Sequence, residues 1–178
     1  LSKLANTNIY IEDNASITAP EIKAKCRRLA SQPNGLGLVV IDYLQLVTTG
    51  SNRVESRQVE VSEISRSLKT MALELDVPVI ALAQLSRSVD KRENKEPALV
   101  DLRESGSLEQ DADLVLFLNR KDYYEAKSEK KENIVPIDVI IAKHRKGSTG
   151  LYRLLFELNM SNFKNYLHTE NEEGGYHE

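Results

Sequence analysis

The stretch that decides the fold is GLVVIDYLQL, residues 37–46. Its first half is an apolar run with valine and isoleucine, which indicates a strand buried on both faces, as in a parallel sheet. Asp42 follows at the carboxyl end of that strand, the edge at which open α/β sheets bind ligands. A carboxylate in this position can hold a hydrated Mg²⁺ beside the phosphates of a nucleotide. Taken alone, Asp42 is explained equally well as a residue that caps a turn or starts the next helix.

The composition is that of an ordinary globular domain. The chain has 178 residues, of which 40% are hydrophobic and 29% charged, and this length predicts one domain that can bury a core. The single cysteine, Cys26, excludes an internal disulfide and fits a reducing cytosol. No apolar run approaches the ~20 residues of a membrane span. A net charge of −3 argues against a broad DNA-coating surface, so any nucleic-acid contact must be a local patch.

Two helices are expected, one before and one after this strand. The first begins at Thr18, with Glu21 as its capping-box partner and Pro20 in its first turn, and it ends at the breaker sequence 33–35. The second spans residues 57–75, where apolar side chains recur at helical spacing among charged ones.

Further apolar stretches predict the remaining strands, at residues 8–11, 77–83, 114–118, 137–142 and 151–158. The short basic connection 143–150 predicts an antiparallel hairpin. We therefore predict an α/β fold: a mainly parallel sheet flanked by helices, with the hairpin at its C-terminal edge.

Four stretches in a fixed order carry a resemblance: VVIDYLQL (39–46), VPVIALAQLSR (77–87), DLRESGSLEQDAD (101–113) and AKHRKG (142–147). Together they resemble the ATPase core of RecA-type hexameric helicases, most closely the bacterial DnaB-like replicative helicases. The resemblance covers residues 7–166 and implies a RecA-like P-loop NTPase core. We assign residues 1–166 to the C-terminal part of that domain and predict that the acidic tail, residues 167–178, is disordered.

The resemblance implies nucleotide-binding roles for two strand-end residues. Asp42 is similar to the Walker B carboxylate, which orders Mg²⁺ at the phosphates of ATP. Gln84 is similar to the glutamine that senses the γ-phosphate, a task that suits an amide because it can donate to a phosphoryl oxygen. Without the resemblance, Gln84 would be interpreted as a strand-end glutamine that meets solvent.

The basic hairpin resembles the element that reaches into the nucleotide site of the neighbouring subunit. Arg145 would be an arginine finger and Lys143 a point charge on the γ-phosphate. Alternation along an extended strand would place both on one side and His144 on the other. The family often has glutamine at the position of His144, so we include His144 in the nucleotide site without assigning its side chain a role. The alternative is a solvated hairpin tip.

Residues 103–106 resemble the loop that lines the central channel of the ring and holds single-stranded DNA. Arg103 would supply charge, Glu104 belongs to the same loop, and Gly106 would let a backbone N–H approach a phosphate closely. The alternative is a linker that leads into a helix starting at Ser107, and position alone does not separate the two.

The resemblance implies part of a replicative hexameric DNA helicase in the bacterial cytoplasm. Such an enzyme couples hydrolysis of ATP, with Mg²⁺, to 5′-to-3′ movement on single-stranded DNA, and it has a primase and a loader protein as partners. The implied assembly is a homohexamer, and no membrane is involved.

One departure from the family is large. The sequence contains no phosphate-cradling G-x-x-x-x-G-K-[ST] motif, and the family's catalytic glutamate would precede Leu1. We therefore expect a fragment that lacks the N-terminal part of the core and is inactive by itself. Two alternatives remain: a naturally P-loop-less module that binds DNA or a partner without hydrolysis, and a fragment of a RecA-like recombinase.

Overall fold

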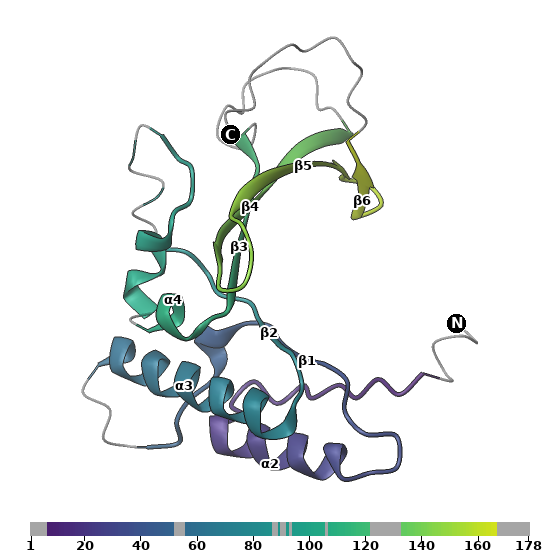
Figure 1. Cartoon of the computed structure of the whole chain (residues 1–178), viewed down its shortest axis with the longest axis vertical. Helices are drawn as coiled ribbons and strands as arrows, with labels where there is room; N and C mark the ends of the chain where they lie inside the picture. The colour runs from purple at the N-terminus through teal and green to yellow at the C-terminus, as the bar shows by residue number, and fades with distance from the viewer. Residues whose placement is uncertain are drawn as a thin grey trace. The chain divides into compact units, whose positions relative to one another are not determined.

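The computed structural model describes residues 7–51, 56–86, 89, 92, 94–105, 107–121 and 133–166 (Figure 1). The chain divides into two compact units. Leu1–Arg87 and Val100–Ala112 form the first unit, and Ser88–Leu99 and Asp113–Glu178 form the second. The tail predicted to be disordered, residues 167–178, lies outside the described residues.

In the first unit, helix α2 (Ala19–Ala30) begins with the predicted capping box. The Glu21 N–H donates to Thr18 Oγ1 at 3.3 Å, and the Thr18 N–H donates to Glu21 Oε2 at 2.8 Å. These contacts occupy N–H groups that have no partner within the helix, and they hold the pKa of Glu21 below its ordinary value. The prediction of this helix from its capping residues is confirmed.

Helix α3 (Arg57–Leu75) matches the predicted range. Ser56 Oγ accepts the Val59 N–H at 3.3 Å as the N-cap, and Asp76 ends the helix in the left-handed conformation, with φ of 51°. One face of the helix is buried at helical spacing, through Val61, Ile64, Leu68 and Met71. This face packs toward α2, and Glu74 of α3 pairs with Lys23 and Arg27 of α2.

Strands β1 (Val39–Ile41) and β2 (Val79–Ala81) form a parallel pair in which Ile41 lies opposite Ala81. Both strands therefore end at the same edge, as the sequence predicts. The core of this unit joins side chains of α2, α3, β1 and the turn that follows β1. These are Ala19, Ile22, Cys26, Ile41, Leu44, Val47, Ile64, Leu68 and Met71. Among the strands of the described residues, the parallel arrangement expected of the fold is limited to this pair (Figure 1).

Burial of β1 and β2 on both faces, expected from their apolar runs, is not seen within the described part of this chain. Val40 is 57% exposed and Ile80 52% exposed, whereas Ile41 is 8% exposed. The two helices supply apolar side chains to one face of the pair only, so alternate residues of the strands remain open. An apolar run predicts a strand, but it does not indicate which face of that strand is packed against other residues of the same chain.

Short helices complete the first unit after β2. The 3₁₀ helix η3 spans Leu99–Ser105, and α4 spans Leu108–Asp111. Ser65 Oγ of α3 donates to Asp111 Oδ2 at 2.7 Å, and Ser107 Oγ donates to the Ser62 carbonyl at 3.3 Å. These two hydrogen bonds attach α4 to α3.

The second unit contains a four-stranded antiparallel sheet in the order β3-β4-β5-β6. Its strands are β3 (Leu114–Asn119), β4 (Ile134–His144), β5 (Gly150–Glu157) and β6 (Asn162–Asn165). The predicted hairpin is confirmed, because β4 and β5 pair antiparallel around the basic turn.

Among the described residues, none forms a helix with the length and apolar composition needed to cross a membrane.

The antiparallel part of the fold is larger than a single edge hairpin. Strand β3 pairs antiparallel with β4, with Leu118 opposite Val139. Its side chains alternate strictly: Val115 and Phe117 are buried, while Leu116 and Leu118 are 51% and 65% exposed. The apolar run correctly predicted a strand, but it did not indicate that the neighbour of this strand is antiparallel.

Candidate functional site

Asp42 lies where the sequence places it, directly after β1 and at the carboxyl edge of the parallel pair. The ladder continues past it on the β2 side: the Leu82 N–H donates to the Ile41 carbonyl at 2.9 Å, and the Leu44 N–H donates to the Leu82 carbonyl at 2.9 Å. Residue Asp42 itself is exposed, because the chain turns there into the 3₁₀ helix η1 (Leu44–Leu46). An accessible carboxylate at this edge can reach a ligand.

Gln84 follows β2 at the same edge, and its main chain is held by the side chain of Gln45. The Gln84 N–H donates to Gln45 Oε1 at 3.3 Å, and Gln45 Nε2 donates to the Gln84 carbonyl at 3.2 Å. Residue Gln84 is exposed. Its backbone is thus attached to the turn after Asp42, while its side chain can contact a ligand.

Gln45 is not among the site residues predicted from the sequence, although it lies in the stretch of residues 37–46. The one available signal was a polar side chain between Leu44 and Leu46 in an otherwise apolar run. Its partner lies 39 positions further along the chain, and local periodicity contains no information on such a contact.

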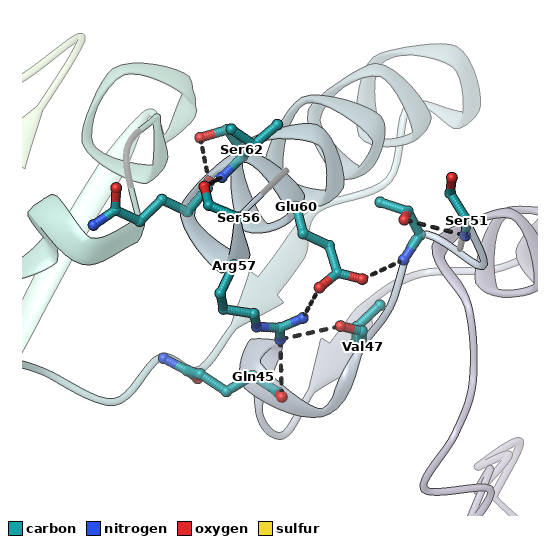
Figure 2. Close-up of polar contacts among 10 residues, drawn as sticks. Gln45, Val47, Ser51, Ser56, Arg57, Glu60 and Ser62 are labelled. Atoms are coloured by element: carbon teal, nitrogen blue, oxygen red, sulfur yellow. Dashed lines mark hydrogen bonds and ion pairs between the residues drawn. The ribbon is translucent and has the colours of Figure 1, made fainter. Parts of the chain in front are cut away.

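Two side chains from the first turn of α3, those of Arg57 and Glu60, hold the loop that carries Gln45, as Figure 2 shows. Arg57 Nη2 donates to the Gln45 carbonyl at 2.9 Å and to the Val47 carbonyl at 3.2 Å, and its Nη1 pairs with Glu60. Glu60 Oε1 accepts the Thr49 N–H at 3.1 Å. One arginine–glutamate pair therefore contacts the backbone at three residues of the loop after β1.

The charge of Glu60 is stabilised in this arrangement. Burial raises the pKa of the Glu60 carboxyl, but donation from the Thr49 N–H and from the Arg57 guanidinium outweighs burial and holds the pKa below its ordinary value. The network is therefore ionised at neutral pH, with the carboxylate as acceptor and the guanidinium as donor.

The basic hairpin belongs to the second unit. Lys143 and His144 are the last residues of β4, and Arg145 lies in the turn. The strand ends at His144, one residue before Arg145, and the expected alternation of Lys143, His144 and Arg145 stays a prediction. The Arg145 N–H donates to the Asp113 carbonyl at 2.8 Å, and Arg145 Nε lies 3.2 Å from Asp113 Oδ1. A side chain at Gly147 would collide with the His144 ring, so that ring lies over the turn.

The predicted DNA-binding loop is described only in part. Arg103 and Glu104 lie in η3, but the positions of their side chains and the whole of Gly106 are outside the described residues. Their assignment to a DNA contact stays a prediction, and so does the alternative of a linker.

A dedicated metal cluster is not present in the part of the chain that the structure describes: no three His, Cys, Asp or Glu side chains converge there. Asp42 offers a single hard oxygen ligand at the strand edge. A single carboxylate fits Mg²⁺, which keeps several waters and takes its remaining ligands from phosphates. It does not fit a metal that needs an all-protein cage.

Solved structures share this architecture. The chain superposes on a solved ATPase domain with a TM-score of 0.82 and 49% sequence identity, over 93% of this chain and 57% of that one. It matches the structure of a DnaB-like replicative helicase, solved to study its interactions with primase, with the same TM-score and identity, over 93% of this chain and 40% of that one. The fold is that of a RecA-like ATPase domain.

The family model for the DnaB-like helicase C-terminal domain matches residues 1–165, and the chain belongs to that family. It is 56% identical over 165 residues to replicative DNA helicase DnaB of Geobacillus stearothermophilus, covering 93% of this chain and 36% of that protein. It is 53% identical to replicative DNA helicase DnaC of Bacillus subtilis (strain 168) over the same shares. The chain thus spans about a third of the length of these two relatives.

Proposed function

We propose that this chain is part of the ATPase domain of a replicative DNA helicase, a homohexamer that couples ATP hydrolysis to 5′-to-3′ movement along single-stranded DNA. The observation that carries the proposal is the pairing of two strand ends. Asp42 and Gln84 follow parallel strands whose last residues, Ile41 and Ala81, lie opposite each other. Family membership and the names of the relatives support the same function.

In this proposal, Asp42 would hold Mg²⁺ through water beside the phosphates of ATP. The metal, when bound, neutralises charge that develops on the phosphates during hydrolysis. Gln84 contacts the γ-phosphate through its side-chain amide and registers its departure. An exposed carboxylate and an exposed amide at one sheet edge support this division of roles.

The hairpin acts on the next subunit of the ring. Arg145 contributes a guanidinium to the neighbour's nucleotide, Lys143 contributes a point charge, and His144 lies between them at the same site. Arg103, Glu104 and Gly106 form the loop that holds DNA in the central channel. The exposure of Arg145 and His144 supports a contact outside the chain.

Further parts of the proposal concern partners and location. One structural neighbour is a helicase whose interactions with primase were studied, and we extend that partner to the full-length protein. A helicase loader and a bacterial cytoplasmic location are implied by the family.

The chain alone should not hydrolyse ATP. Its sequence has no G-x-x-x-x-G-K-[ST] motif, the loop whose backbone N–H groups cradle the β-phosphate. Phosphate release by the purified 178-residue chain should equal that of its Asp42→Asn variant. Turnover that Asp42→Asn abolishes would overturn this proposal.

The deciding experiment uses the full-length helicase with Asp42→Asn. We expect ATP turnover to fall to background while the ring stays assembled, because the substitution keeps the shape of the side chain and removes its charge. Asp76→Asn is the matched control, since Asp76 is also exposed and asparagine tolerates its left-handed backbone. Turnover that survives in Asp42→Asn would refute the role assigned to Asp42, and an unfolded variant would identify Asp42 as structural.

A further inference from the structure

The hydrogen-bond ladder between β1 and β2 continues beyond the last paired residues, Ile41 and Ala81, and its last step is made by the side chain of Gln45. After Ile41 opposite Ala81, the backbone contacts are Leu82 N–H to the Ile41 carbonyl and Leu44 N–H to the Leu82 carbonyl. The next strand residue would need a partner for both its N–H and its carbonyl. At Gln84 one primary amide supplies both, through Gln45 Oε1 at 3.3 Å and Nε2 at 3.2 Å.

A glutamine amide can do this because it carries one acceptor and one donor group on the same plane, as a peptide unit does. The backbone after β1 cannot, because it has turned into η1, where Leu44 is 1% exposed and fills the core. A methionine at position 45 would keep the length of the side chain and lose both hydrogen bonds. A glutamate would keep the acceptor for the Gln84 N–H and, when ionised, would offer no donor to the Gln84 carbonyl.

The turn that carries Gln45 is itself fixed. The Gln45 carbonyl accepts from Arg57 Nη2 at 2.9 Å, and Glu60 connects the same arginine to the Thr49 N–H (Figure 2). Gln84 is thus attached, through one side chain, to a loop held by the start of α3. An exposed residue at the end of a short strand would otherwise have few constraints on its main chain.

We propose that Gln45 is a positioning residue, which holds the main chain of Gln84 so that the Gln84 amide meets the nucleotide in a fixed place. The inference rests on the proposed function, in which Gln84 contacts the γ-phosphate. A displacement of about 1 Å at a reacting group can cost ~10²-fold in rate. Loss of the Gln45 amide should therefore lower kcat ~10- to 100-fold and change the KM for ATP much less.

The first test is amide hydrogen exchange in the full-length helicase, read at Gln84 by mass spectrometry with fragmentation. Gln45→Met should raise exchange at Gln84 roughly tenfold or more, because the N–H loses its acceptor. Gln58→Met is the matched control, since Gln58 is an exposed glutamine in the first turn of α3. Exchange at Gln84 that is the same in Gln45→Met and Gln58→Met would overturn the proposal.

A second variant separates positioning from mere packing. In Gln45→Glu the introduced carboxyl can donate to the Gln84 carbonyl only when protonated, so kcat should move toward wild type as pH falls from about 8 toward the ordinary glutamate pKa of ~4.3. Exchange at Gln84 should stay below that of Gln45→Met at each pH, because the carboxylate keeps the acceptor for the Gln84 N–H. Gln45→Met should show no such recovery relative to wild type at each pH. Equal pH profiles for the two variants would show that the hydrogen bonds from Gln45 to the Gln84 main chain do not position Gln84. This conclusion would hold even if Gln45→Met proved unstable.

A combined variant distinguishes failure of this inference from failure of the proposed function. If Gln45 acts through Gln84, adding Gln45→Met to Gln84→Ala should lower kcat no further than Gln84→Ala alone. Losses that multiply would show that Gln45 acts elsewhere and would overturn the inference. A Gln84→Ala enzyme with normal turnover would instead refute the role of Gln84 in the proposed function. The exchange experiment would still show whether Gln45 holds the main chain of Gln84.

Discussion

Arg145 forms an ion pair with Asp113 of its own chain, with Nε 3.2 Å from Oδ1, and a backbone hydrogen bond joins the same two residues. Both side chains are more than half exposed, at 51% and 58%. An exposed pair of this kind contributes little to stability, about 0–1 kcal/mol. The guanidinium can therefore leave Asp113 at small cost, as an arginine that acts on a neighbouring subunit must.

Asp113→Asn should accordingly change stability by less than about 1 kcal/mol. Asp138→Asn is the contrasting variant in the same unit: this carboxylate is 4% exposed and pairs with Arg153 at 3.0 Å and Lys121 at 3.3 Å. The substitution should cost about 1.5–3 kcal/mol, because the buried group loses its charge and one of the two oxygens that accept from Arg153 and Lys121. Urea unfolding of both variants measures the difference, and equal losses would show that the Arg145 pair is structural.

The Arg57–Glu60 pair predicts a pH-dependent contribution to stability. The folded-state pKa of Glu60 is lowered, so its contribution is fully present above the unfolded-state pKa of ~4.3 and is lost as pH falls through the folded-state value. Glu60→Gln should cost about 1–2 kcal/mol near neutral pH, and the difference from wild type should shrink below about pH 4.

Glu63→Gln serves as the control for Glu60→Gln, because Glu63 is exposed one turn further along α3. Thermal unfolding of both variants and wild type across the acidic range checks the prediction. A Glu60→Gln deficit that persists unchanged at low pH would mean that shape, and not charge, makes the contact.

Much of the fold was predictable because its signals are local. The capping box of α2, the periodicity of α3 and the apolar run before Asp42 each depend on residues within one element. The connection between β4 and β5 is likewise short, and a short connection joins neighbouring strands as an antiparallel hairpin.

The contacts that give the site its geometry were not predictable in the same way. Gln45 meets Gln84 across 39 positions, and Arg145 meets Asp113 across two strands of a sheet. Such pairs depend on the register of the assembled strands, which hydrophobic periodicity does not specify. The pairing of β3 with β4 was missed for a related reason, since its apolar run contains no polar alternation to mark an open face.

Arg103→Ala in the full-length helicase should weaken single-stranded DNA binding more than it lowers DNA-independent ATP hydrolysis. If Arg103 contacts one phosphate, the slope of log affinity against log salt should fall by ~0.7. Arg66→Ala is the control, because Arg66 is an exposed arginine of α3 outside the proposed channel loop. Binding measured by fluorescence anisotropy over a salt series decides the matter, and an unchanged slope would return Arg103 to the role of a linker residue.

The sharpest prediction concerns complementation between subunits. An arginine finger acts on the nucleotide of a neighbour, so full-length subunits with Arg145→Ala and subunits with Asp42→Asn should each be inactive alone. In a mixed ring, the Asp42 of an Arg145→Ala subunit can meet the Arg145 of an Asp42→Asn neighbour, and that site has both groups. Fingers of this kind contribute ~10³–10⁵ in rate in related phosphoryl-transfer enzymes, so a minority of repaired sites should give measurable ATP turnover.

Mixing must be verified independently, by native mass spectrometry of rings with differently labelled subunits. The matched control mixes Arg145→Ala subunits with subunits that carry both Arg145→Ala and Asp42→Asn, since no site in those rings regains a finger. Activity that returns only in the complementary mixture would support action in trans. If the rings mix and their sites fire independently but no activity returns, Arg145 does not act in trans, and the hairpin, with Arg145 paired to Asp113, is a structural edge or a DNA contact.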